Sequence, residues 1–266
     1  MMTDRRRSLV SVAITSVGLM VPLVCNAQIL ETETARPVGR GGLEMGTNFE
    51  YQTSSEGHEA ALPFAVEYGL SDRFEVLVEP VAYTAIRPKA GTRATGVGDM
   101  EVTLTYLARP ESGGTPALAL AGEVKLPTAK NRLIGTGKTD VAGYLIASKR
   151  MGRFDTHANV GYTIVGRPAG AQLKNIFNFA LATQMGFAQN NELFGEILAN
   201  TASSSAGEPT GPVPPGGVIA EAPTGEIVGS VGIARYVIPS LRLSLGVSVD
   251  NNGAFMFRPG FTIRRH

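Results

Sequence analysis

The sequence predicts an all-β fold, a transmembrane antiparallel up-and-down β-barrel of about twelve strands, preceded by a cleaved signal peptide. Three observations predict it. Apolar and polar residues alternate with period two along most of the chain beyond residue 42. The alternating runs reach about nine to eleven residues, the length that a tilted strand needs to cross a bilayer, whereas soluble strands typically have about five or six. The connections between the runs alternate between short and long.

Residues 1–27 have the layout of a secretory signal peptide. Three arginines (Arg5–Arg7) precede an apolar stretch, and Ala27 is a small residue suited to signal peptidase. The apolar stretch has roughly 16 residues, whereas a membrane-spanning helix needs about 20. We therefore expect export with cleavage before Gln28, and two parts: the signal peptide at 1–27 and an outer-membrane barrel domain at 28–266. Cleavage removes Cys25, the single cysteine, so no disulfide is expected.

The first run shows the pattern of the barrel. Leu43, Met45 and Phe49 share one face, while Glu44 and Glu50 share the other. The polar faces mix Gly, Ala, Ser and Thr with scattered charges, as the wall of a narrow lumen does. The expected strands lie within residues 43–51, 62–70, 74–78, 99–106, 118–126, 140–148, 154–162, 177–185, 192–200, 227–237, 241–250 and 255–264. The sixth and ninth runs alternate less regularly, so ten and fourteen strands remain as alternatives.

Outer-membrane barrels have short periplasmic turns and longer outer loops. Short connections are expected at 71–73, 109–115, 149–153, 189–191 and 238–240, and long ones at 85–97, 127–138, 167–174 and 202–225. The connection at 53–58 is intermediate, and the tight one at 250–253 breaks the alternation. Tyrosines fall near expected strand ends, where an interfacial girdle would place them. Tyr51, Tyr83 and Tyr162 lie at the expected outer ends of strands, and Tyr68, Tyr106 and Tyr236 at the expected inner ends. Only Tyr144 is central.

Few residues suggest catalysis or metal binding. Gly135-Thr136-Gly137-Lys138-Thr139 resembles the end of a phosphate loop, but Arg132 stands where that motif needs glycine. His157 shares a polar face with Asp155 and Asn159, yet no set of three or four convergent metal ligands is visible, and no serine accompanies it in the same run. A hydrogen-bonded lumen histidine is the simpler interpretation. We expect no enzyme, no metal and no cofactor.

The inward-facing charges are the candidate functional residues. The expected lumen-facing set is Glu44, Glu50, Asp99, Glu101, Glu123, Lys125, Asp155, His157, Asn159, Arg242, Arg258 and Arg264. In a closed barrel the last strand pairs with the first, which places Arg258 and Arg264 near Glu44 and Glu50. Such charges either form a polarised wall that selects solutes or pair internally and fill a narrow barrel; both interpretations stay open.

Several short motifs resemble one known family. They are Gly96-Val97-Gly98-Asp99, Glu123-Val124-Lys125-Leu126-Pro127-Thr128, Gly135-Thr136-Gly137 with Asp140, and His157-Ala158-Asn159-Val160-Gly161-Tyr162. Together they resemble the MetA-type family named for the meta pathway of phenol degradation, a group of transporter-like outer-membrane β-barrels. The resemblance implies an outer-membrane location and uptake of aromatic or other small organic compounds. It implies no catalytic residues.

The expected function is passive passage of small solutes, including aromatic or hydrophobic ones, across the outer membrane. The alternatives are a closed structural barrel without transport and a lipid-modifying barrel enzyme. The expected partners are outer-membrane lipid, small-molecule solutes and the barrel-assembly machinery, although the chain ends on His266 rather than on phenylalanine. The chain has 24 basic and 23 acidic side chains, so it lacks the basic excess that nucleic-acid binding requires.

Overall fold

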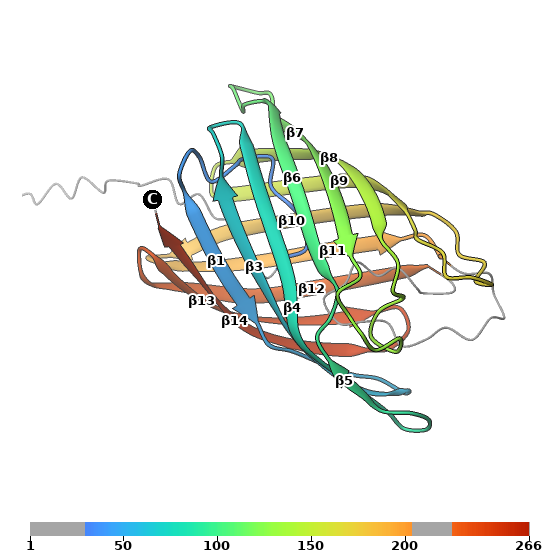
Figure 1. The fold of residues 1–266 in the computed structure, drawn as a ribbon. Helices are drawn as coiled ribbons and strands as arrows, with labels where there is room; N and C mark the ends of the chain where they lie inside the picture. Colours follow the sequence, from blue (N-terminus) through green and yellow to red (C-terminus); the bar gives the residue numbers. More distant parts are fainter. Residues whose placement is uncertain (1–29, 204–224, 266) are drawn as a thin grey trace, which may run out of the picture.

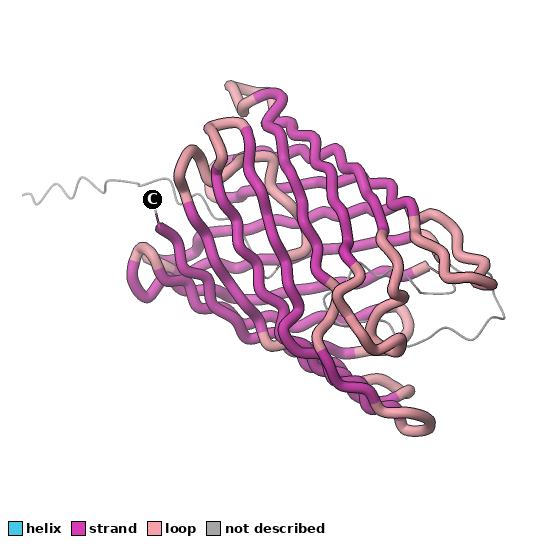
Figure 2. Tube along the Cα trace, in the orientation of Figure 1, coloured by secondary structure: helices cyan, strands magenta, loops and turns pink. Residues whose placement is uncertain are grey.

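The computed structural model describes residues 30–203 and 225–265. The expected signal peptide, most of the expected loop at 202–225 and the terminal His266 lie outside the described residues. All regular structure in the described part is β-strand, joined by turns and loops (Figure 2). No helix in this part is long and apolar enough to cross a membrane.

The strands form one antiparallel sheet that closes on itself (Figure 1). Their bounds are β1 Leu43–Asn48, β2 Glu50–Thr53, β3 Gly57–Gly69, β4 Phe74–Pro88, β5 Ala94–Gly96, β6 Met100–Arg109, β7 Ala117–Leu126, β8 Asp140–Met151, β9 Phe154–Ile164, β10 Ile176–Ala188, β11 Asn191–Asn200, β12 Glu226–Ile238, β13 Leu241–Asp250 and β14 Phe255–Arg265. Phe49 separates β1 from β2, and both segments pair with β3 and β14. Likewise β5 and β6 both pair with β4. Counting β1 with β2 and β5 with β6, twelve strands therefore form the barrel wall.

Closure occurs between the first and last strands. β1 pairs with β14 in the register Leu43↔Arg265 to Asn48↔Gly260. A closed sheet leaves no strand edge unpaired, which is the condition for a sheet to span hydrocarbon. The prediction of a twelve-stranded antiparallel barrel is confirmed, and the less regular sixth and ninth runs are the strands β8 and β11.

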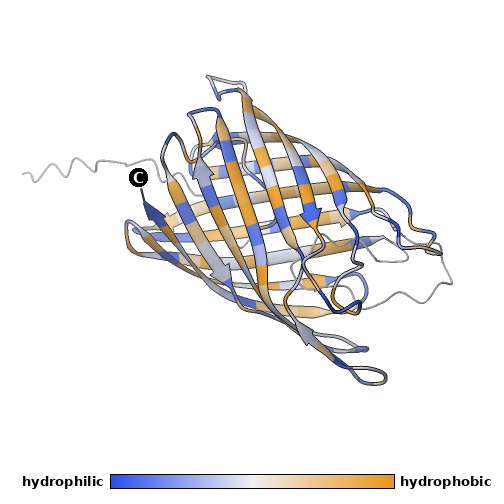
Figure 3. Cartoon of the chain, in the orientation of Figure 1, coloured by the Kyte–Doolittle hydropathy of each residue, from blue (hydrophilic) through white to orange (hydrophobic). Residues whose placement is uncertain are grey.

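The outside of the barrel is apolar. Leu145 of β8 and Val231 of β12 are 62% and 61% exposed, and many other large apolar side chains are exposed along the strands. Their neighbours along each strand point inward, so hydrophobic and hydrophilic residues alternate along the ribbons (Figure 3). Exposed apolar surfaces of this extent are rare in soluble monomers and are typical of a barrel whose outer face contacts lipid. The protein is a transmembrane β-barrel.

The apolar contacts inside the barrel are small and separate. One cluster joins Ala117, Ala119, Ala121 and Ile146 on the wall to Ala35 of the N-terminal segment. Another joins Leu30, of the same segment, to side chains from three later strands. Small residues on the wall therefore leave room for a segment of chain within the lumen.

The connections follow the predicted alternation, with two differences. β3 and β4 have 13 and 15 residues and continue beyond the neighbouring strands, so much of the expected loop at 85–97 is strand (Figure 1). The register shifts at Leu62/Pro63, because proline lacks the N–H that the ladder needs. The connection at the outer end of β2 is also shorter than expected, with only residues 54–56 between β2 and β3.

One tyrosine lies on the opposite face from the one expected. Tyr51, Tyr68, Tyr83 and Tyr162 are at least 40% exposed on the outer surface, as an interfacial girdle requires. Tyr236 is only 9% exposed, so it faces inward and does not belong to the girdle. Tyr236 faces the lumen together with Ser230 and Ala234, as the period-two alternation of β12 requires, and the register shifts only after it, between Tyr236 and Ile238.

Candidate functional site: the lumen and its N-terminal segment

Residues 30–42, here called the N-terminal segment, precede β1, and most of the segment lies inside the barrel (Figure 1). The segment meets the wall at the end with short turns. The Gly41 N–H donates to the Gly69 carbonyl at 2.8 Å, and the Arg40 N–H donates to Asp72 at 3.3 Å. A Cβ at Gly69 would lie 1.7 Å from the Gly39 carbonyl oxygen. Glycine is required at position 69 because the two backbones approach so closely there.

The segment then crosses the lumen on hydrogen bonds to wall side chains. The Val38 N–H donates to Glu75 at 2.6 Å, and the Ala35 N–H donates to the Ser148 hydroxyl at 2.8 Å. The Thr32 N–H and hydroxyl both donate to Glu196, at 2.7 and 2.6 Å. The backbone of a segment without secondary structure needs such partners when it is buried. Polar wall residues on three strands therefore hold the segment in place.

Arg36 is the charged anchor of the segment. Its guanidinium donates to both oxygens of Asp155, at 2.9 and 3.1 Å, and to Glu111 at 2.7 Å. Glu111 lies in the short turn between β6 and β7 and also pairs with Lys149 at 3.0 Å. Partial burial opposes its ionisation, but hydrogen bonds from Arg36, Lys149 and the Arg150 N–H prevail and lower the pKa of Glu111 to about 2. This anchor is therefore ionic at neutral pH.

Many of the inward charges form ion pairs. Arg264 pairs with Glu44, and Arg258 pairs with Glu50 at 2.8 Å, as closure of β14 on β1 and β2 led us to expect. Three further contacts join residues of the expected set to oppositely charged neighbours: Lys125 to Asp140 at 2.5 Å, Lys125 to Asp99 at 4.0 Å, and Arg242 to Glu192 at 3.0 Å.

The expected pair of His157 and Asn159 serves the N-terminal segment. The His157 Nδ1 lies 2.8 Å from the hydroxyl of Ser148, its cross-strand neighbour on β8. With its amide oriented to satisfy both groups, Asn159 accepts from the Glu33 N–H at 2.7 Å and donates to the Glu33 carbonyl at 3.0 Å. Both side chains are buried, and Asp155, their neighbour on β9, is partly buried.

The arrangement of Ser148, His157 and Asp155 has the composition of a hydrolytic triad but not its accessibility. His157 Nε2 lies 3.9 Å from Asp155, beyond hydrogen-bond distance. The Ser148 hydroxyl is fully buried and also contacts Thr34 at 3.3 Å. A nucleophile must reach its substrate, so these residues support the N-terminal segment in this conformation rather than a reaction.

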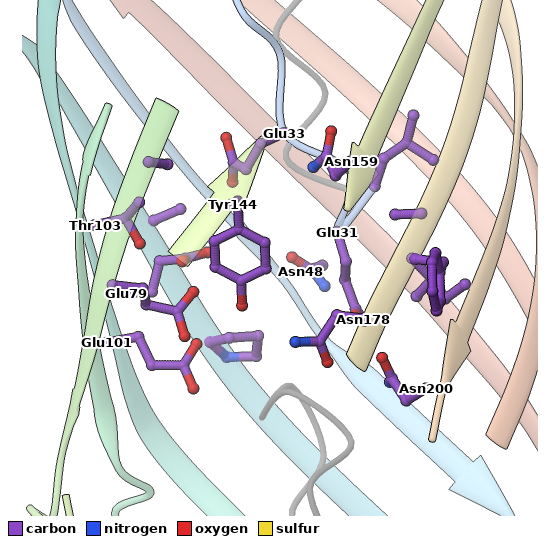
Figure 4. Close-up of a pocket in the computed structure, with 18 of the residues that line it drawn as sticks. Glu31, Glu33, Asn48, Glu79, Glu101, Thr103, Tyr144, Asn159, Asn178 and Asn200 are labelled. Atoms are coloured by element: carbon purple, nitrogen blue, oxygen red, sulfur yellow. The ribbon is translucent and has the colours of Figure 1, made fainter. Parts of the chain in front are cut away.

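Beyond the N-terminal segment the lumen holds a cavity of about 140 Å³ (Figure 4). Six carboxylates and one guanidinium line it: Glu31, Glu33, Glu50, Glu79, Glu101, Glu123 and Arg258. The amides of Asn48, Asn159, Asn178 and Asn200 add polar groups, and the ring of Tyr144 projects into the cavity (Figure 4). Within residues 30–203 and 225–265, no group of three or more acidic, histidine or cysteine side chains is arranged to hold a metal ion.

Sequence reasoning placed Glu50, Glu101, Glu123, Asn159 and Arg258 in the lumen, and all five line the cavity. It missed the N-terminal segment, because a stretch with no period has no signature of its own. The available signal was its length: residues 28–42 lie between the expected cleavage point and the first strand without any assigned role. It also missed the contact of Ser148 with His157, because cross-strand neighbours follow from register rather than from spacing.

Residues 74–206 match the family described as "Putative MetA-pathway of phenol degradation". The COG4313 outer membrane channel from Pseudomonas putida F1 is similar in structure, with a TM-score of 0.62 at 12% identity over 87% of this chain and 98% of that one. The NanC porin gives 0.57 at 10% identity, covering 82% and 98%, and the KdgM porin 0.54 at 9%, covering 83% and 99%. No curated protein sequence matches the chain. At these identities the structures show a shared barrel fold.

Proposed function

The chain belongs to the family described as "Putative MetA-pathway of phenol degradation", and we propose that it is a passive outer-membrane channel for small organic molecules. The observation that carries the proposal is the hollow, polar lumen. A purely structural barrel of twelve strands can be filled by side chains, whereas this one encloses a cavity of about 140 Å³ lined by charged and amide groups.

The family name points to aromatic compounds as one class of solute. The lumen offers such a solute a mixed surface, with the Tyr144 ring beside carboxylates and amides (Figure 4). The N-terminal segment occupies the half of the lumen with the short turns, so a solute that crosses the barrel must pass it. We propose that displacement of this segment sets the conductance.

Swelling of proteoliposomes in neutral solutes of graded size tests the proposal. We expect swelling with small solutes such as phenol-sized alcohols and none with oligosaccharides. Protein that is folded, as judged by heat-modifiable mobility in gels, but that never permits swelling would contradict a channel and favour the closed structural barrel.

The lipid-modifying enzyme remains a second candidate only through Ser148 and His157. We expect no lipase or acyl-transfer activity in either the wild type or a His157→Ala variant. The variant loses the contact between His157 and Ser148, which should loosen the N-terminal segment and raise conductance. Lipid hydrolysis by the wild type that disappears in this variant would overturn the assignment as a channel.

A further inference from the structure

The cavity beyond the N-terminal segment has a large excess of negative charge. Six carboxylates face one guanidinium, that of Arg258, which already pairs with Glu50 at 2.8 Å and with Glu31 at 3.4 Å. No other basic side chain among the described residues lines the cavity, so the four remaining carboxylates have no oppositely charged partner of their own in its lining. Lys125 lies opposite Glu101 in the register of β6 and β7, but its ammonium group forms its salt bridges with Asp140 and Asp99 instead.

Two of these carboxylates are held against each other by the fold. Glu79 of β4 and Glu101 of β6 are direct cross-strand partners, and their side chains lie side by side in the cavity (Figure 4). Like charges directly opposite on neighbouring strands destabilise a sheet. In the described part of the chain neither carboxylate forms a salt bridge. A cation between them would turn this repulsion into attraction.

An independent observation points to a ligand that donates hydrogen bonds. Asn178 is 8% exposed and projects from β10 into the cavity (Figure 4). Its amide nitrogen donates to Thr163 at 2.7 Å, which leaves its oxygen without a partner. One carboxylate oxygen of Glu50, a residue only 1% exposed, is also unpartnered. Buried acceptors without donors are costly, and both lie in the lining of the same cavity.

The size and one aromatic wall narrow the class of ligand. A cavity of about 150 Å³ admits a benzene ring, and this cavity has about 140 Å³. The Tyr144 ring packs over Gly161, where a Cβ would lie 2.3 Å from the ring, and this glycine lets the ring lie across the lumen. A cation near an aromatic face gains further stabilisation.

We propose that this cavity binds a small organic ammonium ion between Glu79, Glu101 and Asn178, and that it makes the channel prefer cationic solutes. The preference in transport rests on the proposed channel function, whereas the binding does not. An ammonium group supplies three donors, and the cavity presents acceptors in excess.

The test uses three probes of similar shape: benzylammonium, benzyl alcohol and benzoate. Protein made without the expected signal peptide is titrated with each probe in detergent by calorimetry, so that every sample has the same N-terminus. We expect benzylammonium to bind more tightly than the alcohol, benzoate to bind least, and the affinity for benzylammonium to fall with salt. Equal affinities for the three probes, tighter binding of benzoate, or no binding of benzylammonium to folded protein would overturn the proposal.

Matched variants localise the site. Glu101→Gln and Glu79→Gln should each weaken benzylammonium binding roughly fivefold, the factor given by a pair of unit charges about 4 Å apart in water. Glu56→Gln removes the same charge from an exposed outer turn and should change nothing. Because Gln keeps the size of Glu and relieves a repulsion, these variants should fold. Equal affinities in Glu101→Gln and Glu56→Gln would show that the cavity carboxylates do not hold the ligand.

Reversal potentials in a salt gradient then separate the two proposals. A conducting channel with cation preference that falls in Glu101→Gln supports both. A conducting channel without that preference overturns the transport part of this inference and leaves the channel function standing. A silent barrel that still binds benzylammonium contradicts the channel function alone.

Discussion

Arg36→Gln is the perturbation whose effect the structure specifies best. The substitution removes three charge-assisted hydrogen bonds between the N-terminal segment and the wall. The wall keeps its own partners, because Asp155 remains paired with Arg150 at 3.1 Å and Glu111 with Lys149 at 3.0 Å. The loss therefore falls on attachment of the segment. Hydrogen bonds to charged groups contribute about 1.5–3 kcal/mol, and we take about 3 kcal/mol for the whole cluster.

That free energy corresponds to roughly a hundredfold shift between attached and detached segment. Single-channel recording in planar bilayers should show a matching rise in the fraction of time spent in the open state. Arg40→Gln is the control, because it removes the same charge from the same segment, while the hydrogen bond from Arg40 to Asp72 comes from the backbone N–H and is kept. Equal open fractions for Arg36→Gln and Arg40→Gln would refute the idea that the anchor holds the segment.

Three further predictions follow from the same geometry. Glu111 has a folded pKa of about 2, below its ordinary 4.5, so its contact with Arg36 is intact above about pH 4.5 and is lost as pH falls toward 2. Channel opening should therefore rise over this pH window in the wild type relative to Glu111→Gln. Parallel pH profiles of the two proteins would contradict this. Gly69→Ala places a Cβ against the Gly39 carbonyl, so it should loosen the N-terminal segment and raise conductance, whereas Gly122→Ala, with open space at its Cβ position, should not. Leu145→Arg puts a charge on the lipid face and should destabilise the barrel by about 2–4 kcal/mol in urea unfolding from vesicles; an unchanged midpoint would mean that Leu145 does not face hydrocarbon.

The strands and their faces could be predicted because a wall between lipid and lumen imposes a strict period of two. Glu44, Glu50 and Glu192 alternate with Met45, Phe49 and Leu193, and the structure divides them between inside and outside accordingly. Closure of the barrel added the pairs of Arg258 and Arg264 with early glutamates, because first and last strands must meet. Tyr236 was misplaced because its position near a strand end was considered without its face, since the alternation along β12 puts it on the lumen side with Ser230 and Ala234.

The contents of the lumen could not be predicted in the same way. The N-terminal segment has no period, and its contacts with Ser148, Glu75 and Glu196 span more than thirty positions in sequence. The cavity depends on the path of this segment through the lumen and on which inward residues are small. Both depend on three-dimensional packing, which a single sequence does not reveal.

A disulfide between the N-terminal segment and the wall tests the central claim most directly. The hydroxyls of Thr34 and Ser148 lie 3.3 Å apart, so Thr34→Cys with Ser148→Cys brings two sulfurs together in a chain whose only native cysteine lies in the expected signal peptide. Oxidised protein should form the disulfide and stay closed, and reduction should restore the channel openings. If the disulfide does not form in folded protein, or if oxidised and reduced barrels conduct alike, the segment does not occupy and control the lumen.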